Sequence, residues 1–460
     1  MNVLEFIPPI LYLLFLVFVI LRIRDREGTA ESFYFASRGI GSRASIISIV
    51  ATETSVATIL IFPAVGYRED LAVLWLCAGY VVGRVIVAFF ILGRIHSFQG
   101  VSLYGFLSSS RGTPVLSGVY LIAKYISGGV RFYMAAYAID ALIGGGVAIW
   151  ILVVALITGL YSLTGGLKSV VLTDQIQGSI LFLAGLWFCW RFFPADVRTL
   201  ADIRFYVPAT LAPVGSGSIF LFLGGLTITL GSHGADQDML QRVFAVRDLS
   251  KARRSLILSG LAASIVILLF AFAGLLMKRS MLPLDATSPL VSYIGQADPL
   301  SKGLFLVLVL AASMSTLDSA MHATGAVIKD LSARLLAENR DSKADAVRRY
   351  SFYSLLLFVL SALLFIEIAK GSYQGDFLGL AMGSMNYVYG GLIGVLLTFV
   401  LERRPVRTAA IVAAMVVGMA TTAFSEMNGL YWPLVTMLSA SMATGASLTA
   451  QRLMRRRSAS

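Results

Sequence analysis

Several charged residues lie inside long apolar stretches of this sequence, where a charge is energetically costly. They are one glutamate, two basic residues and two aspartates: Glu53, Lys124, Arg131, Asp174 and Asp318. A charged side chain at membrane depth usually pairs with another charge or lines a water-filled path. These residues are therefore the first candidates for a binding site. Arg84 also lies in an apolar stretch, but its head group could equally extend to a membrane surface.

Hydroxyl-rich sequences interrupt two of the apolar stretches, at Ala51-Thr-Glu-Thr-Ser-Val-Ala-Thr58 and at Thr227-Ile-Thr-Leu-Gly-Ser-His-Gly-Ala-Asp236. Where a membrane helix breaks, backbone carbonyls lose their helical partners and, together with hydroxyl groups, can bind a hard monovalent cation. A third stretch carries small and hydroxyl residues at three- and four-residue spacing, so that they share one helix face: Ala312, Ser315, Thr316 and Ser319. Such a stripe serves helix packing as often as ion binding, and the residues alone leave both interpretations open.

The elements that position these residues are membrane helices. Of the 460 residues, 57% are hydrophobic and 13% are charged, and the mean hydropathy is +0.82. Continuous apolar runs of about 20 residues match a helix that crosses the bilayer, whereas a barrel would show short alternating segments. The sequence predicts an all-α integral membrane protein with 13 transmembrane helices, at residues 5–23, 43–63, 69–93, 115–139, 146–163, 169–193, 217–235, 255–277, 303–327, 351–369, 377–401, 408–424 and 431–449.

The net charge of +12 reflects membrane topology rather than nucleic-acid binding. When the 13 runs are threaded from an external start, most Lys and Arg residues fall on one side, together with the basic C-terminal tail, as the positive-inside rule requires. We expect a multi-pass protein of the inner or plasma membrane, with the N-terminus outside and the C-terminus in the cytoplasm. The first run begins MNVLEF, without the positive segment of a signal peptide, so we expect it to be a retained helix.

The two interrupted runs lie five helices apart, and this odd spacing reverses their direction across the membrane. Two inverted repeats of five helices meet that requirement and are common in transporters. We therefore expect an extra N-terminal helix and loop at 1–42, a first repeat at 43–193, a second repeat at 216–401, and two further helices with a basic tail at 402–460. Ten core helices then lie between residues 43 and 401.

Four segments form a recognisable set: Phe33-Tyr-Phe-Ala-Ser-Arg38 with the Ala51 stretch and Pro63 to Tyr67, Thr164-Gly-Gly-Leu-Lys-Ser-Val-Val-Leu-Thr-Asp-Gln-Ile-Gln177, Asp236-Gln-Asp-Met-Leu-Gln-Arg242, and Ser315-Thr-Leu-Asp-Ser319 followed by Asp330. In this order they resemble the sodium-solute symporter family, and most closely its bacterial sialic acid transporter branch. The resemblance covers nearly the whole chain. It implies a LeuT-like fold and solute uptake coupled to Na⁺.

The resemblance also implies ion sites. The common sodium site would use the backbone carbonyls of Ala51, Thr54 and Ala312 with the hydroxyls of Ser315 and Thr316. A second site would use Asp174, Asp318 and Ser319. Asp318 stands where the family more often has a neutral or small residue, so these two acids could instead share a proton.

For the solute, the resemblance implies a pocket lined by Ser55, Thr58, Thr229, Ser232 and His233. Arg131 resembles the arginine with which the sialic acid branch binds a carboxylate, and a guanidinium suits that planar anion. The expected solute is therefore carboxylate-bearing, such as sialic acid or a similar sugar acid. Alternatively, Arg131 pairs with Glu53, which resembles the acid of the proline branch, and the solute is an amino acid or a neutral sugar.

Other function classes fit less well. A channel usually repeats a pore element around an axis, whereas two interrupted helices in inverted positions favour alternating access. A membrane enzyme would need a catalytic motif, and the sequence contains no HExxH, nucleophile elbow or cofactor loop. A sensory module would need an attached signalling domain. We expect a non-enzymatic monomer whose partners are sodium ions, a small solute and lipid, without nucleic acid.

Overall fold

The structure is a computed structural model that describes residues 3–21, 29–98, 100–194, 196, 200, 202–207, 217–335, 344–372 and 377–457. Helices form nearly all of it, and the described residues contain only two isolated β-bridges. The helices are η1 Val3–Glu5, α1 Ile7–Leu21, α2 Ala30–Phe35, η2 Ala36–Arg38, α3 Ser42–Glu53, α4 Val56–Glu69, α5 Leu74–Ile86, η3 Val87–Ile91, α6 Leu92–Ile95, α7 Tyr104–Leu107, α8 Thr113–Ile143, α9 Val147–Arg191, α10 Ser218–Gly234, α11 Gln237–Phe244, α12 Leu249–Arg279, α13 Pro289–Gly295, α14 Pro299–Leu335, α15 Ala344–Ser372, α16 Phe377–Glu402, α17 Thr408–Met427 and α18 Trp432–Arg457.

Each of the 13 predicted runs falls on a helix of this list. Within the described ranges, six helices are individually long and apolar enough to cross a membrane, and up to nine spans result when three bent pairs are each counted as one. Two predicted runs, 146–163 and 169–193, are joined in α9. A kink at Gly166 separates them, with φ 61° and ψ −165°, a conformation that glycine tolerates.

Both predicted helix breaks are present. The axes of α3 and α4 differ by 67°, and those of α10 and α11 differ by 63°. At the first break Ser55 caps α4, because its side chain accepts a hydrogen bond from the Ala57 amide. At the second, Asp236 caps α11 by accepting from the Asp238 amide. Short polar side chains thus satisfy the amides that each break exposes.

Small residues bring the broken helices close to their neighbours. A Cβ added at Gly79 of α5 would lie 2.1 Å from the Phe222 carbonyl oxygen of α10, and one at Gly274 of α12 would lie 2.0 Å from the Pro63 carbonyl oxygen of α4. Such backbone approach is how membrane helices gain packing energy. Each of these broken helices is therefore packed closely against a neighbouring helix.

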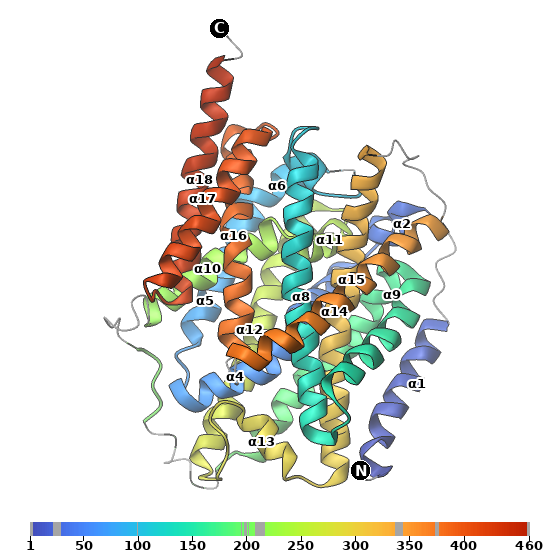
Figure 1. The fold of residues 1–460 in the computed structure, drawn as a ribbon. Coiled ribbons are helices and arrows are strands. Elements are labelled where there is room, and N and C mark those ends of the chain that lie inside the picture. Colours follow the sequence, from blue (N-terminus) through green and yellow to red (C-terminus); the bar gives the residue numbers. More distant parts are fainter. Residues whose placement is uncertain are drawn as a thin grey trace.

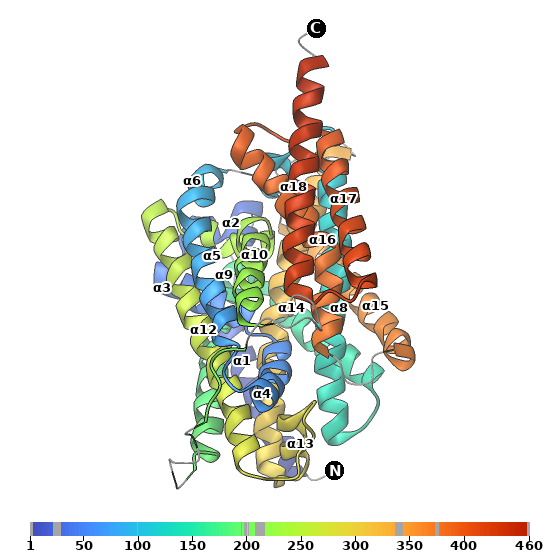
Figure 2. The same cartoon turned by 90° about the vertical axis from the view of Figure 1, so that its left-hand side faces the viewer.

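Figures 1 and 2 show how the bundle is arranged. In Figure 1, helices α16, α17 and α18 lie together on one side and α1 lies on the other, and Figure 2 again shows α16, α17 and α18 together. The described N- and C-terminal ends lie at opposite ends of the bundle in both views. The division into repeats at 43–193 and 216–401 stays a prediction.

At the end of the bundle that carries α13, buried Asp70 follows α4 and connects it to the segment 202–207 and to α12. It accepts hydrogen bonds from Arg204 at 3.1 Å and from Lys278 at 3.1 Å. Burial raises the pKa of Asp70, but these bonds outweigh burial and leave its pKa below the ordinary value. Asp70 therefore stabilises the fold above the unfolded pKa, and this contribution is lost as the pH falls through the lower folded pKa.

We expect Asp70→Asn to lower the free energy of unfolding by on the order of 1 kcal/mol at pH 7, because both partners are partly exposed and screened. The difference should shrink as the pH falls below about 4, the ordinary aspartate pKa, and should vanish once the pH is below the lower folded pKa. Thermal melts of both proteins at pH 7 and pH 3 measure it. Equal destabilisation at both values would contradict the ionic account.

Candidate functional site

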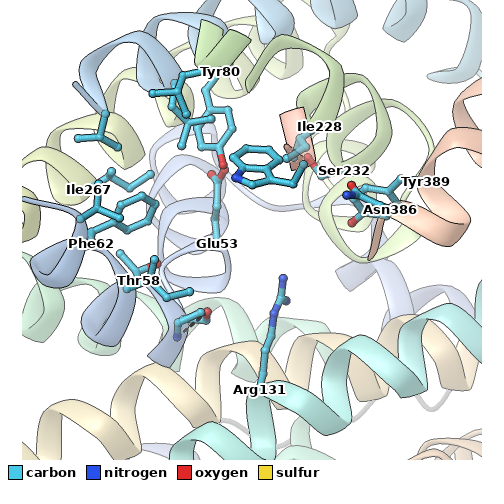
Figure 3. A pocket seen from close by; sticks show the side chains of 18 of the residues that line it. Glu53, Thr58, Phe62, Tyr80, Arg131, Ile228, Ser232, Ile267, Asn386 and Tyr389 are labelled. Carbon is cyan, nitrogen blue, oxygen red and sulfur yellow. Dashed lines mark hydrogen bonds between the residues drawn. The ribbon is translucent and has the colours of Figure 1, made fainter. Parts of the chain in front are cut away.

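A cavity of about 150 Å³ lies between the two broken helices. Its walls come from α3, α4, α5, α8, α10, α11, α12, α16 and the start of α18. Six residues predicted from the sequence line it: Glu53, Ser55, Thr58, Arg131, Ser232 and His233. Figure 3 shows several of these side chains around the same space. The structure thus brings together residues from both predicted helix breaks.

Arg131 enters the cavity from α8 as a half-buried cation. Its side chain points into the space bordered by Glu53, Ser232 and Asn386 (Figure 3). No hydrogen bond or ion pair joins its guanidinium to another described residue. An unpaired guanidinium at membrane depth can bind an anion through two parallel hydrogen bonds.

Glu53 pairs with Arg84 and not with Arg131. An Arg84 guanidinium nitrogen contacts the Glu53 carboxylate, and the Arg84 side chain is fully buried. Ser259 lies 3.4 Å from the same guanidinium. The alternative in which Arg84 extends to the membrane surface is therefore wrong, and so is direct pairing of Arg131 with Glu53. The nearest contact of His233 with Glu53 is 4.0 Å.

The predicted α10 residues separate into two groups. Ser232 and His233 line the cavity, and the Ser232 hydroxyl lies 2.8 Å from His233 Nδ1. Thr229 does not line the cavity. Its hydroxyl donates to the Gly225 carbonyl of its own helix, and a Cβ added at Gly83 of α5 would lie 2.8 Å from the Thr229 Cβ. Thr229 thus belongs to the packing between α10 and α5.

An ion-pair cluster forms one wall of the cavity. Lys124 lies 2.7 Å from Asp236 and 3.0 Å from Asp238, and all three side chains are buried. The Tyr120 and Tyr389 hydroxyls each donate to Asp236 at 3.2 Å. The segment Asp236 to Arg242 therefore supplies both a helix cap and members of this ion-pair cluster. Each acid of this wall has a cationic partner, and the two acids share Lys124.

Aromatic side chains line much of the remaining wall, and the sequence analysis did not identify them. They come from the four helices α4, α5, α16 and α18 and from the residue before α18: Phe62, Tyr80, Tyr389, Tyr431 and Trp432. Asn386 adds an amide near Tyr389 (Figure 3). Aromatic residues are common throughout the apolar runs, so no local signal separates these from core residues. The cavity therefore combines apolar walls with one unpaired cation.

The predicted sodium ligands gather where α14 meets the end of α3. The Ser315 hydroxyl donates to the Ala51 carbonyl at 3.0 Å and to the Ala312 carbonyl at 3.2 Å. The Thr316 hydroxyl donates to the Thr52 and Ala312 carbonyls at 3.2 and 3.1 Å. Four of the five predicted residues therefore share one cluster of oxygens.

Thr54, the fifth predicted ligand, lies at the same break. It ends α3 with ψ 80°, outside helical geometry. Its side-chain oxygen is buried and has no hydrogen-bond partner among the residues that the structure describes. A buried hydroxyl without a partner is unusual and suits a site that receives a ligand. Oxygen donors from a helix break and a facing helix fit a monovalent cation.

An arginine side chain lies within the predicted second cation site. Arg242 of α11 lies 3.2 Å from Asp174 and also contacts the Ser319 hydroxyl. Asp174 accepts a further hydrogen bond from Ser48, and Ser319 donates to Asp318 at 3.1 Å. Asp174, Asp318 and Ser319 are therefore close together. The sequence analysis named Arg242 only as part of a motif and missed its place here.

Comparisons with known proteins agree with this architecture. The model of the sodium:solute symporter family matches residues 33–418. The human sodium/iodide cotransporter is 26% identical over 76% of this chain and 59% of its own length. A putative sodium-dependent multivitamin transporter of Drosophila melanogaster is 24% identical over 80% of this chain and 65% of its own length. The chain thus spans less than two thirds of both relatives.

A solved structure of a sodium-coupled sialic acid symporter, in a substrate-bound outward-open state, superposes with a TM-score of 0.83 and 18% identity over 98% of both chains. A nucleobase-cation-symport-1 family transporter superposes with a TM-score of 0.61 and 15% identity. Those likenesses confirm the expected all-α, multi-span, LeuT-like membrane fold. The chain therefore belongs to the sodium:solute symporter family, a family of transporters rather than enzymes.

Proposed function

We propose that this protein is a sodium-coupled symporter that imports a small carboxylate-bearing solute by alternating access. The observation that carries the proposal is Arg131, whose guanidinium faces the cavity without an acidic partner. Two acids of the lining already have cationic partners, since Glu53 pairs with Arg84, and Asp236 with Lys124, so neither compensates Arg131. A solute carboxylate would complete the remaining pair.

Sodium coupling follows from family membership together with the oxygen cluster between α3 and α14. The ligands in this proposal are Ala51, Thr54, Ala312, Ser315 and Thr316. A small gap lined by Ser55, Arg131 and Thr316 lies between the solute cavity and this cluster. Solute and ion would therefore bind next to each other, so that each could stabilise the helix break that the other uses.

The finer identity of the solute is proposed from resemblance, as sialic acid or a similar sugar acid. The aromatic walls extend the possible solutes to carboxylates with a compact apolar body, because aromatic surface binds apolar groups or the faces of sugar rings. An amino acid or a neutral sugar is the alternative. A neutral solute would leave Arg131 uncompensated, which makes it the less favourable choice.

Uptake into proteoliposomes tests the proposed function. Labelled sialic acid, a compact apolar carboxylate, an amino acid and a neutral sugar would each be offered with an inward sodium gradient, and with potassium in place of sodium. We expect a carboxylate to accumulate above its external concentration only with sodium. Equilibration without accumulation would indicate a channel, and accumulation of the neutral sugar alone would remove the carboxylate assignment.

For Asp174, Asp318 and Ser319, the two alternatives are a second cation site and a pair of acids that share a proton, and we favour the shared proton. Arg242 already compensates Asp174, which argues against a second sodium ion beside that acid. We therefore expect one sodium ion per solute in reversal-potential measurements, and the same ratio in Asp318→Asn protein. Asp330→Asn is the matched control, since Asp330 lies on the same helix and pairs with Arg334. A ratio of two that falls to one in Asp318→Asn would establish the second sodium site.

A further inference from the structure

A groove of about 340 Å³ lies on the outside of the bundle, between η3 and the first turns of α12. It is separate from the solute cavity and shares no lining residue with it. Its lining has a cationic part, Arg253 and Arg254 with Ser250, and an apolar part, Phe89, Ile257 and Leu258. The sequence analysis interpreted the basic residues here only as markers of topology.

Arg253 differs from an ordinary surface cation in how it is held. Arg253 donates from Nε to the Ala88 carbonyl at 2.9 Å, and its guanidinium carbon lies 5.6 Å from the centre of the Phe89 ring. These contacts fix the guanidinium while leaving its terminal nitrogens available. Arg254 is exposed beside it. Among the residues that the structure describes, neither arginine has an acidic partner within ion-pair distance.

An apolar surface continues from the groove along α12. Ile257, Leu261 and Ile265 recur every four residues and so share one helix face, and Leu261 and Ile265 are 46% and 52% exposed. Phe89 and Phe90 on the neighbouring helix are 55% and 66% exposed. In a membrane helix this surface faces acyl chains, and the arginines lie about one turn nearer the helix start, at the level of lipid head groups.

We propose that this groove binds an anionic phospholipid, with the phosphate on Arg253 and Arg254 and an acyl chain along the stripe of Ile257, Leu261 and Ile265. A guanidinium pair matches phosphate oxygens in geometry and charge. Basic pockets between membrane helices commonly hold anionic head groups. The apolar stripe distinguishes a lipid from free phosphate, which would gain nothing from it. On the predicted topology, the groove faces the cytoplasmic leaflet.

Native mass spectrometry of the full-length protein, released from mixed micelles, can measure the bound lipid. The lipids are phosphatidylglycerol and phosphatidylcholine with the same acyl chains. Each surface arginine contributes roughly fivefold to binding of an anionic lipid, so Arg253→Gln with Arg254→Gln should weaken phosphatidylglycerol binding by about 30-fold. Arg111→Gln is the control, because Arg111 is an exposed arginine outside the groove, and binding should change less than twofold.

A second variant keeps both charges and fills the apolar part of the groove. Leu258→Trp should also lower phosphatidylglycerol binding, while size-exclusion and melting profiles report whether the variant folds. The proposal is overturned if the double arginine variant binds phosphatidylglycerol like the wild type. It is also overturned if phosphatidylcholine binds equally well. The same holds if inorganic phosphate displaces bound phosphatidylglycerol as effectively as added phosphatidylglycerol does. These readouts need no transported solute, so they are independent of the proposed function.

Discussion

Solute binding is expected to weaken more than a hundredfold when Arg131 is replaced with alanine. Removing one partner of a buried charge pair costs roughly 3 to 5 kcal/mol, and about 1.4 kcal/mol corresponds to each factor of ten. Because Arg131 is half-buried, the effect should lie at the lower end of that range. Calorimetric titration of purified protein at saturating sodium measures it. Arg131→Lys should restore little, since an ammonium cannot form the two parallel bonds of a guanidinium.

Arg84→Ala provides the contrasting variant. Arg84 is fully buried against Glu53, so its loss should lower the melting temperature, with partial recovery in the Glu53→Ala, Arg84→Ala double mutant. Arg131→Ala should leave the melting temperature nearly unchanged, because it breaks no ion pair within the protein. A folded Arg131→Ala protein that binds solute within a few-fold of wild type would end the carboxylate assignment.

The helices and their breaks could be predicted from the sequence because both depend on local composition. A run of about 20 apolar residues has few alternatives to a membrane helix. The breaks are likewise visible in local composition, because polar residues interrupt the apolar runs at Ala51 to Thr58 and at Thr227 to Asp236. Arg131 and the hydroxyls of Ser315 and Thr316 could be placed because family motifs fix their positions along helices.

Which side chains pair across helices could not be predicted in the same way. Arg84 meets Glu53, and Arg242 meets Asp174, over long separations in sequence. These pairs depend on the rotation of each helix about its axis, and a break resets that rotation. Thr229 shows the consequence, since its side chain faces α5 rather than the cavity. The aromatic walls were missed because such residues occur on every face of apolar helices.

Sodium affinity is expected to fall tenfold to a hundredfold in Thr316→Ala protein. A hydrogen-bonding contact to a charged group is worth roughly 1.5 to 3 kcal/mol, or about one to two factors of ten. In the structure the Thr316 hydroxyl lies between the Thr52 and Ala312 carbonyls, so it joins α3 and α14. A bound cation would replace those hydroxyl bonds with its own contacts to the same oxygens. Thr316→Ser retains the hydroxyl and should keep most of the affinity.

The rival interpretation is that the hydroxyl stripe only packs the helices together. Packing alone predicts a lower melting temperature in Thr316→Ala with no change in the sodium midpoint of a thermal-shift or uptake titration. Thr398→Ala is a suitable control, because Thr398 is a buried threonine whose hydroxyl bonds only its own helix, at the Gly394 carbonyl. If Thr316→Ala and Thr398→Ala share the wild-type sodium midpoint, the cluster at Ala51, Ser315 and Thr316 is a packing contact, and the coupling ion must bind elsewhere.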